Sequence, residues 1–181
     1  MDFCCYWGKA ALEAPPGPRW HLLPYHSLDV AAVGITLLAR HDRLRGTLET
    51  LLGIDAATLR SWMGFFLSVH DLGKFGHTFQ NQRPEVVEQL GGEHSSIPYT
   101  VRHDSGGWSI WQTHARDRVI AAAPLPSAAA RLCDVWARCA TGHHGNLLQT
   151  RWGPFVSARR RSSLPVEFRP RWSGSTAPFG S

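Results

Sequence analysis

The stretch IDAATLRSWMGFFLSVHDLGKFGHTFQ, residues 54–80, contains the clearest helical pattern of the chain. Its apolar side chains recur at helical spacing, Asp55 can cap the start of the helix, and Gly73 can end it. The predicted helix therefore runs directly into His70 and Asp71. Burying an unpaired carboxylate beside so apolar a helix would cost roughly several kcal/mol. A metal ion or a tight hydrogen-bond network would remove that cost, so partners for Asp71 are expected elsewhere in the chain.

The rest of the chain predicts an all-α fold. With 181 residues, of which 43% are hydrophobic and 18% charged, the chain suits one globular domain. The segment 91–107 is rich in loop-forming residues, and no alternating pattern is long enough to predict a sheet. We expect a helical bundle over residues 1–150 and an irregular tail over 151–181. Besides the helix over 54–71, apolar periodicity predicts helices over 26–40, 43–53, 84–90 and 127–140.

The net charge of +5 lies entirely in the tail. Residues 1–150 carry 13 basic and 13 acidic side chains, whereas residues 151–181 carry six arginines and the single acid Glu167. Such a basic segment suits salt-dependent contact with nucleic-acid phosphates. The alternative interpretation is a solvated terminus without a binding role.

The composition also indicates a compartment. No apolar run approaches the ~20 residues that a membrane span needs, and the N-terminus lacks the apolar segment of a signal peptide. The four cysteines form neither a CxxC pair nor a disulfide framework. These features predict a cytoplasmic protein with no membrane partner.

Ten histidines accompany only two lysines, and several histidines occur where helices begin or end. His26 lies near the start of the helix 26–40, and His143 and His144 follow the helix 127–140 within the sequence GHHG. Imidazole and carboxylate ligands suit first-row ions such as manganese, iron, cobalt or nickel. Two such ions ~3.5–4 Å apart, bridged by one carboxylate, can activate water and stabilise an in-line phosphoryl displacement. The pattern predicts metal-dependent phosphoryl chemistry.

Lys74 has two possible roles. It could contact a substrate phosphate as a point charge, or it could bond to the last carbonyls of the preceding helix. A nucleotide-binding P-loop is excluded, because Phe75 replaces the required Ser or Thr and Ser68 replaces the first Gly.

Five short motifs occur together in the order of one known family: WGKA (7–10), YHSLDVAAVG (25–34), HDLGKFGHTFQ (70–80), RHDSGG (102–107) and TGHHG (141–145). In this respect the chain resembles the HD nuclease domain of the CRISPR-associated helicase-nuclease of type I systems, most like subtype E. The resemblance implies an HD-domain helical bundle that binds two transition-metal ions and nicks, then degrades, single-stranded DNA. It also implies an RNA-guided CRISPR surveillance complex as partner.

The resemblance assigns site residues motif by motif, with Asp71 bridging the two ions and Lys74 as a catalytic residue beside it. His103 is preferred over His94 because the pair Arg102–His103 matches the family segment that precedes a Gly-Trp helix. The first ion would be held by His26, His70 and Asp71, and the second by Asp71, His103, His143 and His144.

The sequence departs from the family pattern after the GHHG motif. The family completes its first metal site with an aspartate well downstream, whereas Glu167 is the only later carboxylate here. The helicase half is also absent. We therefore expect a truncated domain with a weak first site and impaired activity, with a separate helicase subunit as a further candidate partner. The alternatives are an inactive protein that binds the surveillance complex or DNA, and a nucleotide phosphohydrolase of the wider HD superfamily.

Overall fold

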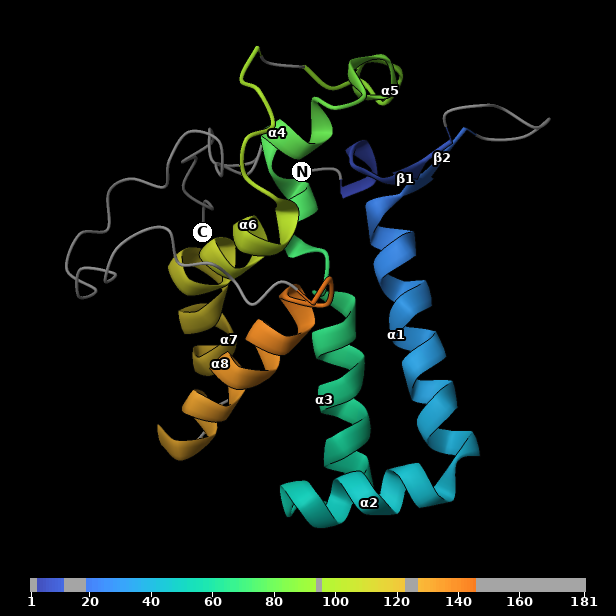
Figure 1. Cartoon of the computed structure of the whole chain (residues 1–181), viewed down its shortest axis with the longest axis vertical. Helices are drawn as coiled ribbons and strands as arrows, with labels where there is room; N and C mark the ends of the chain where they lie inside the picture. Colours follow the sequence, from blue (N-terminus) through green and yellow to red (C-terminus); the bar gives the residue numbers. More distant parts are fainter. Residues whose placement is uncertain (1–2, 12–18, 94–95, 123–126, 146–181) are drawn as a thin grey trace, which may run out of the picture.

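A computed structural model describes residues 3–11, 19–93, 96–122 and 127–145. This part of the chain is mostly helical, as predicted, with one small two-stranded sheet near the N-terminus (Figure 1). The predicted tail over 151–181 lies outside the described residues. None of the helices in the described ranges is both long and apolar enough to cross a lipid bilayer. The elements are η1 (Phe3–Cys5), β1 (Trp7–Ala10), β2 (Trp20–Leu22), α1 (Leu23–Arg40), α2 (Asp42–Leu52), α3 (Ala56–Ser68), η2 (Leu72–Phe75), α4 (His77–Gln80), α5 (Pro84–Gln89), α6 (His103–Ile110), η3 (Trp111–Ala115), α7 (Arg116–Ala122) and α8 (Ser127–Thr141).

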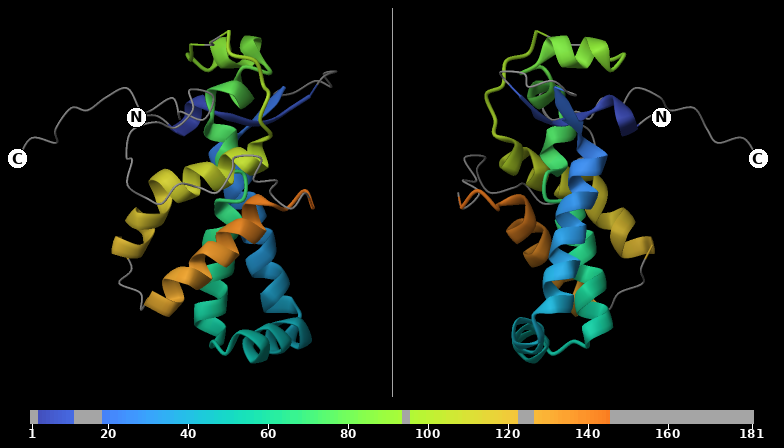
Figure 2. Two further views of the ribbon diagram at one scale, coloured as in Figure 1. Left: turned by 60° about the vertical axis from the view of Figure 1, so that its left-hand side comes forward. Right: turned by 90° about the vertical axis from the view of Figure 1, so that its right-hand side faces the viewer.

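The two long helices α1 and α3 lie side by side, and α2 crosses the end at which they are joined (Figures 1 and 2). Helix α2 is capped at its C-terminal end by Gly53, whose φ of 64° is the left-handed conformation favoured by glycine. Asp55 caps α3 as predicted, because its side chain accepts a hydrogen bond from the backbone amide of Thr58 at 2.8 Å. This arrangement directs the C-terminal end of α3 toward the start of α1.

The prediction that α3 continues to Asp71 is wrong, since the helix ends at Ser68. The ring Nδ1 of His70 donates a hydrogen bond to the carbonyl oxygen of Leu67 at 2.7 Å. In a continuing helix that carbonyl would accept from the backbone N–H of Asp71. His70 and Asp71 therefore lie in a turn, and the chain continues into the short 3₁₀ helix η2.

The expected loop over 91–107 is also partly wrong, because α6 begins at His103. The two glycines Gly106 and Gly107 made a helix unfavourable by propensity alone. Both glycines are buried in the fold, where α6 packs against η2. Tertiary packing has outweighed the local preference.

The sequence did not predict the hairpin of β1 and β2. Its strands are three or four residues long and pair antiparallel, with Trp7 opposite Leu22 and Ala10 opposite Trp20. The alternation of so short a pair carries almost no signal. The hairpin brings the segment WGKA against the first turns of α1, where a Cβ on Gly8 would lie 3.3 Å from the Cβ of His26.

Two hydrophobic clusters flank the turn that carries Asp71. One lies beneath the hairpin and is built on Trp7, Phe79, Val86 and Val87. The other joins α3, η3 and α8. Because the turn connects α3 to α4, it is fixed from both sides by packed side chains. The second cluster is built on Phe66, Trp111, Cys133 and Ala137.

Candidate metal centre

Asp71 lies at the centre of the site and is 2% exposed. One of its carboxylate oxygens, Oδ2, is surrounded by nitrogen atoms. His26 Nε2 and His70 Nε2 each lie 3.1 Å from it, and Lys74 Nζ lies 2.7 Å from it. His26 comes from the first turn of α1 and Lys74 from η2, so this side of the carboxylate is formed by segments distant in sequence. His26, His70 and Asp71 are called the buried group below.

The other oxygen of Asp71, Oδ1, is buried and makes no hydrogen bond to any described residue. Its nearest ionisable neighbours are His103 Nε2 at 3.5 Å and His143 Nε2 at 3.7 Å. An unsatisfied buried carboxylate oxygen is costly and demands an explanation. A cation between Oδ1 and the two imidazoles would satisfy all three groups.

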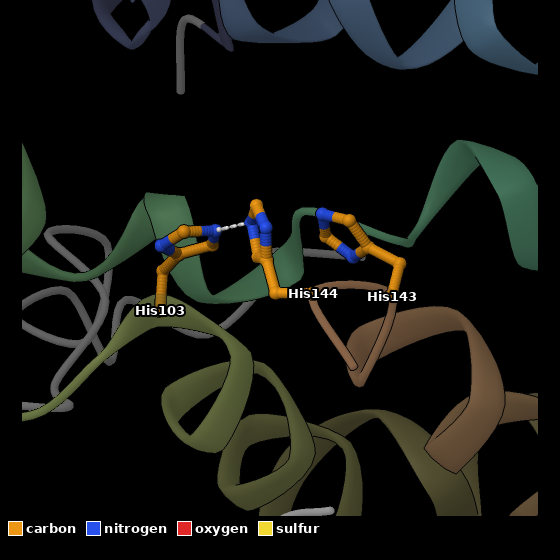
Figure 3. A group of neighbouring side chains, drawn as sticks. All are labelled: His103, His143 and His144. Atoms are coloured by element: carbon orange, nitrogen blue, oxygen red, sulfur yellow. Dashed lines mark hydrogen bonds between the residues drawn. The ribbon is translucent and has the colours of Figure 1, made fainter. Parts of the chain in front are cut away.

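His103, His143 and His144 form a second cluster, called the outer group below (Figure 3). His103 projects from the start of α6, and His143 and His144 lie in the turn after α8. The Nε2 atoms of His103 and His144 are 2.9 Å apart, and the ring centres of His143 and His144 are 4.1 Å apart. His143 and His144 are exposed, so solvent or a substrate can reach this side.

Two of the imidazoles are oriented by the same local device. His70 and His143 each follow a helix and place Nδ1 against the carbonyl oxygen three residues earlier, at 2.7 and 2.9 Å. A carbonyl oxygen can only accept, so Nδ1 carries the proton and the Nε2 of a neutral ring turns its lone pair toward Asp71. Histidines that bind metals are commonly held in this way by a carbonyl acceptor. A proton or a metal ion between Nε2 and the carboxylate would remove the repulsion between their lone pairs.

The electrostatics keep the carboxylate charged and three imidazoles neutral. Burial alone would raise the pKa of Asp71, but the neighbouring side chains of His70 and Lys74 outweigh burial and hold that pKa far below its ordinary value. Burial lowers the pKa of His103 to about 4, against the opposing charge of Asp71. Burial also lowers the pKa values of His26 and His143. Metal binding requires ionised carboxylates and neutral imidazoles, so these groups are in the required state at pH 7.

The donor set fits divalent transition ions. In each group, one ligand atom per residue lies within 4.8 Å of the others. Imidazole nitrogens with one carboxylate are typical ligands of manganese, iron, cobalt, nickel and zinc. The lone oxygen Oδ1 lies on the side of the outer group, and Oδ2 lies on the side of the buried group. The arrangement can therefore accommodate a cation on either side of one carboxylate.

The fold brings all six sequence-predicted ligands to one place. Whether they bind metal remains a prediction, and His94, the alternative to His103, lies outside the described residues. Lys74 is 5% exposed and donates to Asp71 and to the carbonyl oxygen of Gly8 at 3.2 Å. It bonds to strand β1 and not to the helix carbonyls considered above. Its predicted contact with a phosphate remains a prediction.

Sequence reasoning assigned no role to Gln80 or Tyr99. Gln80 is completely buried, and its side chain bonds to both the N–H and the C=O of Trp7, at 3.1 and 2.9 Å, and to the C=O of Lys74 at 2.8 Å. It therefore ties strand β1 to η2. Tyr99 places its hydroxyl 2.7 Å from the backbone N of His103 and 3.2 Å from Nδ1 of the same residue. No local pattern indicated this contact, because Tyr99 lies outside a helix, before the start of α6.

Comparison with known families matches residues 7–172 to the family described as Cas3, HD domain. Among curated proteins, the CRISPR-associated endonuclease/helicase Cas3 of Escherichia coli (strain K12) is 28% identical over 190 residues. The match covers 93% of this chain and 21% of that protein, so the chain spans about a fifth of the relative's length. No solved structure matches significantly. The family match covers most of the chain and includes every candidate ligand, and the chain therefore belongs to the Cas3 HD-domain family.

Proposed function

We propose that this chain is a metal-dependent nuclease domain that hydrolyses phosphodiester bonds of single-stranded DNA. The buried group would hold one divalent transition ion, and the outer group, together with Asp71, would hold a second. Asp71 would bridge the two. Manganese, iron, cobalt and nickel suit this donor set.

One observation carries the proposal: the two oxygens of Asp71 face two separate sets of imidazoles. Oδ2 lies 3.1 Å from both His26 and His70, whereas Oδ1 lies nearest to His103 and His143 and has no hydrogen bond within the described part of the chain. A buried carboxylate held only for structural reasons usually has both oxygens satisfied. Family membership supports the same chemistry, because the curated relative is named as an endonuclease.

Bound ions would supply a water of lowered pKa and positive charge beside the phosphate. The chain's own residues have simpler tasks. Asp71 and the imidazoles fix the positions of the ligand atoms, and Lys74 keeps the Asp71 carboxylate ionised and oriented. The direct phosphate contact of Lys74 would require its ammonium group to leave both Asp71 and Gly8, so we assign Lys74 to Asp71. The exposed faces of His143 and His144 mark the side from which DNA would enter.

The test is nicking of circular single-stranded DNA by the purified chain with Mn²⁺, Co²⁺ or Ni²⁺. We expect metal-dependent nicking that Asp71→Asn abolishes, because the amide removes the charge needed by both sites while keeping the size of the side chain. Asp117→Asn is the matched control, since Asp117 is an exposed carboxylate on α7. Nicking by the Asp71→Asn variant at the wild-type rate would contradict the proposal.

A second candidate function is binding without cleavage, to DNA or to an RNA-guided CRISPR surveillance complex. It is favoured because Oδ2 of Asp71 already lies within 3.1 Å of Lys74 and two imidazoles. These neighbours can satisfy this oxygen without a metal ion. A separate helicase subunit would be a further partner in either case. Tight binding to single-stranded DNA without metal-dependent nicking would support this function. Hydrolysis of free nucleotides would instead indicate a phosphohydrolase.

A further inference from the structure

Three elements that contain or adjoin candidate ligands, η2, α6 and α8, meet at a contact too close for a side chain at Gly73. A Cβ atom placed on Gly73 of η2 would lie 1.8 Å from the carbonyl oxygen of His103 and 2.5 Å from the backbone N of Gly107, both in α6. Real Cβ atoms do not approach other heavy atoms within 3.0 Å. Helix α6 therefore packs on η2 backbone against backbone, and only glycine permits this at position 73.

Gly107 extends the same contact to α8. A Cβ placed on Gly107 would lie 3.1 Å from the backbone N of Gly73 and 3.2 Å from Cγ2 of Thr141. Thr141 is 1% exposed, and its hydroxyl donates to the carbonyl oxygen of Ala137 at 2.9 Å, so its methyl group is fixed in position. An added methyl group at Gly107 would have to push η2, α8 or both away from α6.

Each of the three junction residues lies close in sequence to a candidate ligand. Gly73 follows Asp71 by two residues, Gly107 follows His103 by one helical turn, and Thr141 precedes His143 by two residues. The separation of the three backbones therefore sets how far Oδ1 of Asp71 lies from His103 and His143. That oxygen is the buried, unbonded atom described above, which points to a ligand in the space between them.

We infer that Gly73, Gly107 and Thr141 are positioning residues that set the geometry of the outer group relative to Asp71. This inference rests on the proposed two-ion site. The Oδ2 side of Asp71 is held by His26, which comes from α1, and by His70, which precedes the junction, so the buried group depends on the junction less than the outer group does. Widening the junction should therefore affect the ion near the outer group and leave the other ion in place.

The experiment is a calorimetric titration of the metal-free 181-residue chain with Mn²⁺ alone. For Gly107→Ala we expect the dissociation constant of the outer-group ion to rise about 10- to 100-fold, the range typical when groups that orient metal ligands are lost. The ion of the buried group should bind as in the wild type. Two equally affected ions, or none affected, would overturn the inference.

A rescue variant separates positioning from general damage. Thr141→Ser removes Cγ2 but keeps the hydroxyl, so it relieves the contact with α8 and leaves the 3.1 Å contact with the backbone N of Gly73. The double variant Gly107→Ala/Thr141→Ser should therefore regain part of the lost affinity. Gly64→Ala is the matched control, because its Cβ would lie 3.0 Å from Ile35 Cδ1 at the contact of α3 with α1. The control should leave both dissociation constants unchanged. Failure of Thr141→Ser to restore binding would count against the junction.

A metal-free crystal structure of Gly107→Ala distinguishes failure of the inference from failure of the proposed function. A wild-type chain that binds no Mn²⁺ would defeat the proposed two-ion site. The role of the junction could still be tested by the distance from Asp71 Oδ1 to His103 Nε2, which is 3.5 Å in the wild type. A longer distance in the variant supports the junction as a spacer, and an unchanged distance overturns it.

Discussion

The buried group, which contains Asp71, and the outer group, which faces Oδ1 of Asp71, are built differently. In the buried group, His70 is 8% exposed and Asp71 2% exposed, and the carboxylate is held by Lys74, which is itself buried. In the outer group, His143 and His144 are exposed, and His103 contacts His144. All three members of this group are imidazoles, and none is a carboxylate. One half of the site is thus part of the core, and the other half is completed at the surface.

Because of this difference, we expect the buried group to contribute to folding stability and the outer group to contribute mainly to metal binding. A buried charge that loses its partner is strongly destabilising, so the residues around Oδ2 must contribute to folding whether or not a metal is bound. The exposed imidazoles of the outer group, those of His143 and His144, can be exchanged for smaller side chains with little loss of packing. Substitutions in the two groups should therefore give different signatures in unfolding and in metal binding.

The largest expected effect on stability comes from Lys74→Met. The variant leaves the charge of Asp71 buried without its ammonium partner, and breaking such a pair typically costs about 3–5 kcal/mol. Urea unfolding of the metal-free chain measures this loss. Saturating Mn²⁺ should recover part of it, because a divalent cation replaces the missing positive charge. An unchanged free energy of unfolding would mean that Lys74 does not support the carboxylate.

A smaller loss is expected from Asp55→Ala, at the far end of α3 from the site. The hydrogen bond from the Thr58 amide lowers the pKa of Asp55 from its ordinary value of 3.8. The stability given by this cap is therefore complete above pH 3.8 and is lost as the pH falls through the lower pKa of the folded state. We expect the melting temperatures of wild type and variant to differ at pH 7 and to converge in strong acid.

The same variant is a control for the metal titrations. Because Asp55 is remote from both groups, Asp55→Ala should bind Mn²⁺ as the wild type does despite its lower melting temperature. Loss of metal in this variant would show that any destabilisation impairs the site, which would remove the distinction between the two groups.

The smallest effect on stability is expected from His143→Ala. An exposed imidazole outside the hydrophobic clusters should change the free energy of unfolding by no more than about 0.5 kcal/mol. The number of Mn²⁺ ions bound per chain, measured by elemental analysis after dialysis, should nevertheless fall by one. A large loss of stability in the metal-free variant would show that the outer group also belongs to the core.

The sequence predicted the helices whose patterns are local. The apolar periodicity and the cap at Asp55 predicted the helix over 54–71. The motif GHHG predicted that a helix ends beside two adjacent imidazoles. The sequence did not predict where α3 stops, because the ring of His70 takes the carbonyl of Leu67. Local propensity also missed α6, since Gly106 and Gly107 disfavour a helix until η2 packs against it, and only the resemblance implied a helix after Arg102–His103.

The sequence by itself determined which residue types are available: six candidate ligands with donor atoms suited to transition ions, five of them at predicted starts or ends of helices. Only the tertiary structure decided that they meet around one carboxylate and that its two oxygens face different groups. The physical reason is that propensity and periodicity act over a few residues, whereas these distances depend on how closely backbones from η2, α6 and α8 can pack. That closeness is set by missing side-chain atoms at Gly73 and Gly107, whose effect appears only when distant segments are in contact.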